Sequence, residues 1–122
     1  MKTTTLQLLP TTSYGTPSGN YDGSSQDFSG DPQQAANYYG GFGGLQTVAF
    51  FLSSFQGRIK IEATLDAVPV TESSWFRVSD YDSNNATSTT NFSDNITGNF
   101  TWLRATVTDF QAGTISKIML SY

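Results

Sequence analysis

The C-terminal stretch from Gly98 to Tyr122 constrains the fold of this chain more than any other part of the sequence. Between Thr101 and Val107, apolar and polar side chains alternate with a period of two, which is typical of a half-buried β-strand. A turn signal follows at 109–113, where glycine supplies the positive φ that a turn or bulge needs. The apolar run from Thr114 to the C-terminus predicts a second strand. We therefore expect a hairpin-like pair around which the other strands assemble.

Composition extends this β character to the whole chain. Charged residues make up only 13% of the 122 residues, against about a quarter in ordinary soluble domains. Gly, Ser, Thr, Asn and Tyr take their place, which favours strands and turns, and helix-forming Glu occurs only at positions 62 and 72. The length suits one domain with one core. We therefore expect a single all-β domain.

Three further strands are predicted in the middle of the chain. Residues 45–53 form an apolar run typical of a buried strand, whereas 58–66 alternates apolar and charged side chains, as a half-buried strand does. A third strand is expected over 75–82, and the polar stretch 83–99 is expected to be a connection. A strand spacing of about ten residues favours an antiparallel β-sandwich of jelly-roll or discoidin-like type.

Residues 1–44 differ from the rest because Gly and Ser dominate and tyrosines are spread among them. Thr3, Leu6, Leu8 and Leu9 indicate one short strand. The aromatic residues argue against disorder, so we expect an extended arm that lies either on its own sandwich or on a neighbouring subunit. This divides the chain into an arm, 1–44, and a sandwich core, 45–122. The arm residues expected at a partner interface are Tyr14, Tyr21, Tyr38, Tyr39 and Phe42.

The residue inventory argues against an enzyme. The chain has no His and no Cys, which removes the commonest general base, the thiol nucleophile, disulfides and thiolate metal sites. No GxSxG or SxxK motif occurs. A carboxylate pair for glycoside hydrolysis would have to be brought together by folding. Its candidate members are Glu62, Asp66, Glu72, Asp80, Asp82 and Asp94. We expect no catalytic residue and no cofactor.

The run from Asp80 to Asn84 places several oxygen ligands close together, as a Ca²⁺ loop does. It lacks the glycine and the terminal glutamate of an EF-hand loop, so a polar turn is the favoured interpretation. No metal site is predicted.

Aromatic residues in the core region leave two interpretations open. Trp75, Tyr81 and Trp102 either pack in the core or an interface, or they form a platform that stacks on a glycan. Four N-x-Ser/Thr sequons, at positions 85, 91, 95 and 99, are expected to be unused, because no signal peptide precedes them.

Charge and hydropathy limit the partners. The net charge is −4, and the six Lys and Arg residues form no basic stripe, so we expect no nucleic-acid binding. The longest apolar run, Val48 to Leu52, is too short to cross a bilayer. We expect a protein that is made in a cytosol and leaves it by lysis or within an assembly.

Several segments together resemble small virion structural proteins of T4-like and other tailed phages, especially those of marine cyanobacterial hosts. The segments that carry the resemblance are NYDGSS at 20–25, NYYGGFGGLQTVAF at 37–50, GRIKIEATLD at 57–66, SSWF at 73–76 and the whole of 98–122.

This resemblance implies a non-enzymatic bacteriophage structural protein that occurs in the virion in many copies. A capsid decoration or accessory protein is the first expectation, and a tail, neck or baseplate component with a carbohydrate-binding sandwich is the alternative. The partners would be other virion proteins and further copies of the chain, with a host surface glycan added in the second case. The resemblance supplies no catalytic, cofactor or metal residues.

Overall fold

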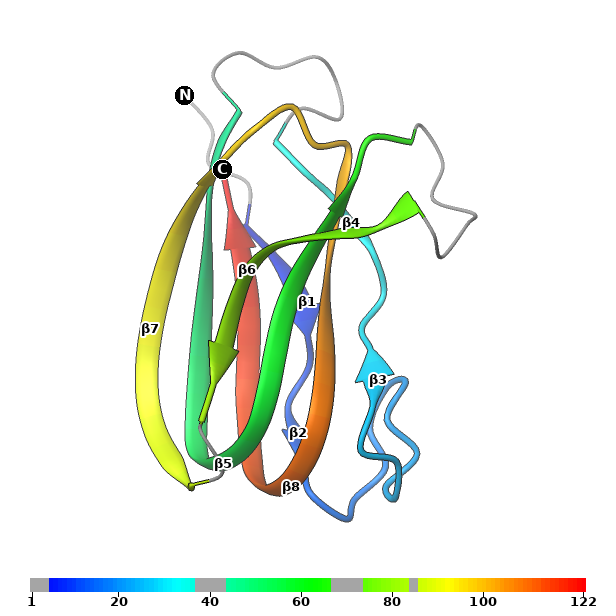
Figure 1. Cartoon of the computed structure of the whole chain (residues 1–122), viewed down its shortest axis with the longest axis vertical. Coiled ribbons are helices and arrows are strands. Elements are labelled where there is room, and N and C mark those ends of the chain that lie inside the picture. The colour runs from blue at the N-terminus through cyan, green and yellow to red at the C-terminus, as the bar shows by residue number, and fades with distance from the viewer. Residues whose placement is uncertain (1–4, 37–43, 67–73, 84–85) are drawn as a thin grey trace.

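Two 20-residue strands, β5 (Leu45–Thr64) and β8 (Trp102–Ser121), form the framework of the fold. The structure, a computed structural model, describes residues 5–36, 44–66, 74–83 and 86–122. Within it, β5 and β8 pair antiparallel from Thr47 opposite Ser121 to Thr64 opposite Trp102. Figure 1 shows that both strands bend at the lower end of the molecule, so that the two halves of each run in opposite directions.

The other strands add to the two sides of this framework. The order through the sheet is β1-β8-β5-β6, every pairing is antiparallel, and the sheet is not closed. Four short strands pair with β8: β1 (Thr5–Leu9), β2 (Thr12–Ser13), β3 (Phe28–Ser29) and β4 (Gln33–Gln34). Two pair with β5: β6 (Phe76–Asp82) and β7 (Ser88–Thr97). The all-β, antiparallel class is confirmed.

The bend is built from residues with positive φ. Ser54 has a φ of 50° and Asp109 of 54°, while Gly113 has a φ of 90°. A Cβ atom on Gly113 would lie 2.1 Å from the carbonyl oxygen of Ser54, so only glycine fits where the strands cross. These irregularities bend the strands without ending their pairing. The expected hairpin is therefore wrong: both halves of β8 pair with β5.

The connection expected over 83–99 is also wrong in large part, because it contains β7. This ten-residue strand pairs with the first half of β5, from Leu45 opposite Thr97 to Phe55 opposite Ser88. Its outward side chains are polar, so the sequence of this strand contains no apolar run that would indicate it. The inward Phe92 is the signal that could have revealed it, since its ring stacks on Phe50.

One hydrophobic core contains side chains from both halves of both long strands. Its largest fully buried members on these strands are Phe50, Phe55, Ile59, Ile61, Leu103, Phe110, Ile115, Ile118 and Leu120. The first region of the chain adds Leu8, Leu9, Tyr21 and Phe28. Burying each of these large side chains stabilises the fold by about 1.5–3 kcal/mol. The described part of the first region, 5–36, is thus packed on the same chain.

The bend also brings together strands that are not paired in the sheet. The rings of Tyr81 on β6 and Phe92 on β7 lie 5.5 Å apart, and Ser79 donates a 2.6 Å hydrogen bond to Asp94. On the other side, the Tyr122 hydroxyl donates a 2.8 Å hydrogen bond to the carbonyl of Gln34. The sheet therefore curls around its core.

Candidate functional site

The first half of β5 and the second half of β8 present an outward surface with almost no charge. Cross-strand register places Ser93, Ala49 and Met119 side by side, and the neighbouring positions follow the same alternation. We call this surface the neutral face. It comprises Thr5, Gln7, Thr47, Ala49, Phe51, Asn91, Ser93, Asn95, Lys117, Met119 and Ser121. Lys117 is its one charged residue.

The other halves of the same strands, together with β6, present a surface rich in ion pairs. We call it the charged face, and it comprises Arg58, Lys60, Glu62, Arg77, Asp80, Asp82, Arg104 and Thr106. The pairs join Arg58 to Asp82 at 2.8 Å, Arg77 to Asp80 at 3.0 Å and Arg104 to Glu62 at 2.9 Å. Two of these pairs join neighbouring strands, and the Arg77–Asp80 pair lies within β6.

The Arg104–Glu62 pair is the most deeply placed of the three. Its side chains are 10% and 18% exposed, and the hydroxyl of Thr106 donates a hydrogen bond to the same Glu62 oxygen. The guanidinium of Arg104 lies 4.4 Å from the centre of the Trp75 ring, a cation–π contact. Because these charges are held by each other and by Trp75, we assign them a structural role.

The Arg58–Asp82 pair lies nearer to solvent. Asp82 accepts hydrogen bonds from both Nε and Nη2 of Arg58. That hydrogen bonding, followed by the negative charge of Asp82, raises the pKa of Arg58 above its ordinary value. Arg58 therefore stays charged, but solvent screens the pair, which limits its value for stability.

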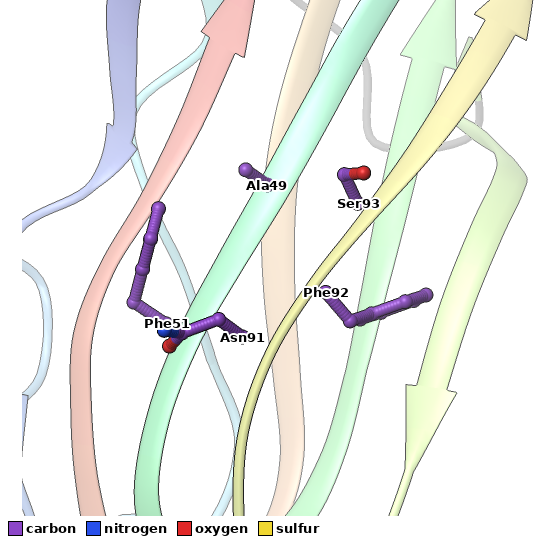
Figure 2. Close-up of a pocket in the computed structure, with 5 residues that line it drawn as sticks. All are labelled: Ala49, Phe51, Asn91, Phe92 and Ser93. Atoms are coloured by element: carbon purple, nitrogen blue, oxygen red, sulfur yellow. The ribbon is translucent and has the colours of Figure 1, made fainter.

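A pocket opens on the neutral face between β5 and β7 (Figure 2). It has a volume of about 190 Å³ and is lined by Ala49, Phe51, Asn91, Phe92 and Ser93. Figure 2 shows Ala49, Phe51, Asn91 and Ser93 along the two adjacent strands, with the Phe92 side chain directed away from Phe51. The pocket therefore combines an aromatic ring with an amide and a hydroxyl, and no carboxylate lines it.

The surroundings of the pocket continue this chemistry. The Lys117 ammonium lies 4.9 Å from the centre of the Phe51 ring, so the one cation of the face is directed at an aromatic side chain. At the next outward pair of positions along β5 and β7, Thr47 donates a 2.7 Å hydrogen bond to the Asn95 side chain. The surface can therefore both donate and accept hydrogen bonds, and it carries little charge.

Only part of the expected arm interface lies within the described residues. Tyr14 is 50% exposed and meets Phe110 edge-on, with ring centres 5.5 Å apart. Tyr21 is 1% exposed, its ring packs against Phe28 and Phe110, and its hydroxyl accepts a hydrogen bond from the Gly15 amide. A ring buried in this way has no surface left for a neighbour, so Tyr21 is a core residue. Positions 38, 39 and 42 lie outside the described residues.

The three residues of the expected glycan platform do not form one surface. Trp75 lies over Arg104 on the charged face. Tyr81 points to the core side of β6, where its ring lies near Phe55 and Phe92. Trp102 is partly buried at the start of β8. Because Trp75 and Tyr81 lie on opposite sides of the sheet, no single ligand can stack on all three.

The oxygen-rich run that begins at Asp80 is engaged within the protein. Asp80 and Asp82 form ion pairs with arginines, and the Ser83 hydroxyl accepts a 3.0 Å hydrogen bond from the Gly57 amide. Asn84 lies outside the described residues. The part of the chain that the structure describes gathers no three Asp, Glu, His or Cys side chains able to hold a metal ion. Nor does it contain a helix long and apolar enough to cross a membrane.

A loop outside both faces holds a carboxylate, that of Asp22, whose pKa is strongly lowered. Asp22 accepts hydrogen bonds from the backbone amides of Ser24 and Ser25 and from the Ser25 hydroxyl. The backbone amides are the main cause that lowers the pKa of Asp22 to about 2. The backbone amides and serine hydroxyls that hold the carboxylate all come from the next three residues and close a turn, so we assign the arrangement to loop structure.

The neutral face is not apparent from the sequence, because the apolar run 45–53 predicts a buried strand. Val48, Phe50 and Leu52 are buried, but Ala49 and Phe51 face outward. The alternation was concealed because both outward residues are apolar.

No protein-family model matches the chain, and no match appears among curated proteins or among solved structures.

Proposed function

We propose that this chain is a non-enzymatic structural protein of a bacteriophage virion, present in many copies as a capsid decoration or accessory protein. The observation that supports it most is where the resembling segments lie. The segment 37–50 runs into the first half of β5, 57–66 spans its second half, and 98–122 contains β8. Three of the resembling segments therefore include parts of the two strands on which the fold depends, while the segment 20–25 lies in a loop.

The finer architecture belongs to the same proposal. The bent sheet acts as two packed layers, a β-sandwich of jelly-roll or discoidin-like type. In support, the core is one cluster that contains residues from both halves of β5 and β8. The contacts of Tyr81 with Phe92 and of Ser79 with Asp94 also join the strands on either side of the bend.

The contact with neighbouring virion subunits is proposed at the end of the molecule opposite the bend. Three large apolar side chains are exposed there: Leu45 is 58% exposed, Leu65 64% and Phe76 40%. They lie at the two ends of β5 and the start of β6, which Figure 1 shows in the upper part of the molecule. Exposed large apolar side chains are a common feature of protein interfaces.

The packing of residues 5–36 on the core determines what truncation is expected to do. Removing 1–44 would strip Leu8, Leu9 and Phe28 from the core and uncover one side of β8. A folded monomer is therefore not expected to survive, and point substitutions provide the better test.

The test is incorporation into particles of a triple variant, Leu45→Ser, Leu65→Ser and Phe76→Ser. We expect the variant to be folded but depleted from purified virions, as measured by quantitative blotting. Phe51→Ser, an equally polar replacement on the neutral face, is the matched control and should be incorporated normally. Normal incorporation of the triple variant would contradict the proposed contact, and absence of the wild-type chain from virions would contradict the function.

A second function, a tail, neck or baseplate component that adheres to host glycans, is favoured by the neutral face. A displayed surface of hydroxyls, amides and one partly exposed ring suits a carbohydrate. Immunogold labelling of intact particles separates the two positions: labels over the head support decoration, and labels confined to the tail or neck support adhesion.

A further inference from the structure

We infer that the pocket beside Phe51 binds a single neutral sugar ring. This site lies away from Trp75, Tyr81 and Trp102, and it does not depend on which part of a virion carries the chain. Its residues come from paired positions of two strands, with Phe51 opposite Asn91 and Ala49 opposite Ser93.

The chemistry of the lining matches that of a pyranose. A sugar ring has C–H faces that stack on an aromatic side chain, and a rim of hydroxyls that both donate and accept hydrogen bonds. Phe51 supplies the ring, the Asn91 amide supplies a donor and an acceptor, and Ser93 supplies a hydroxyl. The small side chain of Ala49 keeps the space between them open.

The charge distribution selects a neutral ligand. No charged side chain lines the pocket, and the nearby Lys117 ammonium lies over the Phe51 ring. A uronate or sulfated sugar would need cations directed at its anionic group, usually arginines. Arg58, Arg77 and Arg104 all lie on the charged face, where they pair with carboxylates.

Size limits the ligand further. The volume of about 190 Å³ is below the range of about 300–1,000 Å³ that holds drug-sized ligands, so one ring fits and a branched oligosaccharide does not. The further rings of a longer saccharide would lie over the next outward pair of residues, Thr47 and Asn95.

The pocket is supported from beneath. The Phe92 ring stacks on Phe50 with centres 4.9 Å apart and an interplanar angle of 12°. Phe50 is fully buried in the core. Strand pairing and this stack therefore hold the lining residues in place before a ligand arrives, which reduces the ordering that binding requires.

The test is a titration of the ¹⁵N-labelled full chain, followed by amide chemical shifts, with free glucose, galactose, mannose and N-acetylglucosamine. We expect at least one of these sugars to shift the amides at 49, 51 and 91–93 saturably, with a dissociation constant of about 1–10 mM. Glucuronate and a sulfated monosaccharide serve as the anionic comparison, and each should bind at least about tenfold more weakly.

Two variants separate the site from a general effect. Phe51→Ala should weaken binding at least about tenfold, whereas Phe51→Trp should keep or strengthen it because a larger ring remains. Tyr14→Ala removes another partly exposed aromatic ring outside the neutral face and should leave the titration unchanged. The inference is overturned if no neutral sugar shifts these amides at about 50 mM, if Phe51→Ala leaves binding intact, or if the anionic sugars bind as well. None of these outcomes bears on incorporation into virions.

Discussion

The two outward faces of this protein are made by the same two strands, and yet their chemistry is opposite. Before the bend, β5 presents Thr47, Ala49 and Phe51 to solvent; after it, the strand presents Arg58, Lys60 and Glu62. Because the core-facing positions are apolar on both sides of the bend, burial alone does not require this difference. Ion pairs join side chains of the charged face, whereas a neutral hydrogen bond and a cation–π contact join side chains of the neutral face.

The largest effect of a substitution is expected at the bend, which separates the two faces. We expect Gly113→Ala to destabilise the fold by about 3 kcal/mol or more, because the added Cβ combines an unfavourable positive φ with overlap on the Ser54 carbonyl. Gly15→Ala is the matched control, since Gly15 has a φ of 86° but no atom within 4 Å of the added Cβ. It should cost only about 1 kcal/mol. Urea denaturation measures both, and equal effects would show that the crossing of the strands is not close.

The next largest effect is expected on the charged face. Arg104→Ala leaves Glu62 with a poorly solvated charge and removes the contact with Trp75, so we expect a loss of about 2–3 kcal/mol. The double variant Arg104→Leu with Glu62→Leu removes both charges and should recover most of that loss. A double variant no more stable than Arg104→Ala would argue that packing, and not charge pairing, governs this position.

Smaller effects should distinguish the faces by their response to salt. Arg58→Ala removes a solvent-exposed ion pair and should lower the stability only slightly, with the difference from wild type shrinking as salt rises. Asn95→Ala on the neutral face removes an uncharged hydrogen bond with Thr47, so its effect should not depend on salt. Thermal unfolding in low and high salt compares them. A salt-dependent Asn95→Ala variant would mean that the neutral face is electrostatically coupled to the rest of the chain.

The smallest effect is expected in the loop that belongs to neither face. The folded-state pKa of Asp22, about 2, lies below the ordinary value near 3.9. The stabilisation from this carboxylate is therefore fully present above about pH 4 and is lost as pH falls toward about 2. A carboxyl ¹³C titration should give a midpoint near the lower value, and Asp22→Asn should flatten the stability change over this window. A midpoint near 4 would contradict the amide hydrogen bonds to the carboxylate.

The all-β, antiparallel class could be predicted because alternation and composition both indicate it. The continuity of β5 and β8 could not, because turn residues such as Gly57 and Gly113 are compatible with a hairpin and with a bend inside one strand. The strand β7 could not be predicted for a different reason. Its polar side faces solvent, and only the spacing of Phe92 and Ile96 marks its inward side.

The candidate pocket could not have been found from the sequence. Its members come from segments that are about 40 residues apart and that meet only through the pairing of β5 with β7. Conversely, the sequence alone allows Tyr21 and Tyr81 to be contact residues, because tyrosine suits interfaces as well as cores. Only the packing of their rings on Phe28, Phe55, Phe92 and Phe110 tells the two environments apart.

The most direct test of the account is thiol labelling on intact virions, which is simple because the chain has no natural cysteine. A Ser93→Cys variant places the thiol on the neutral face, and a Leu65→Cys variant places it at the apolar end. Both should react with a maleimide in the free protein. In purified particles, we expect the thiol at 93 to react and the thiol at 65 to be protected. Protection at 93 with reaction at 65, or a chain that is absent from particles, would contradict a virion protein that displays its neutral face.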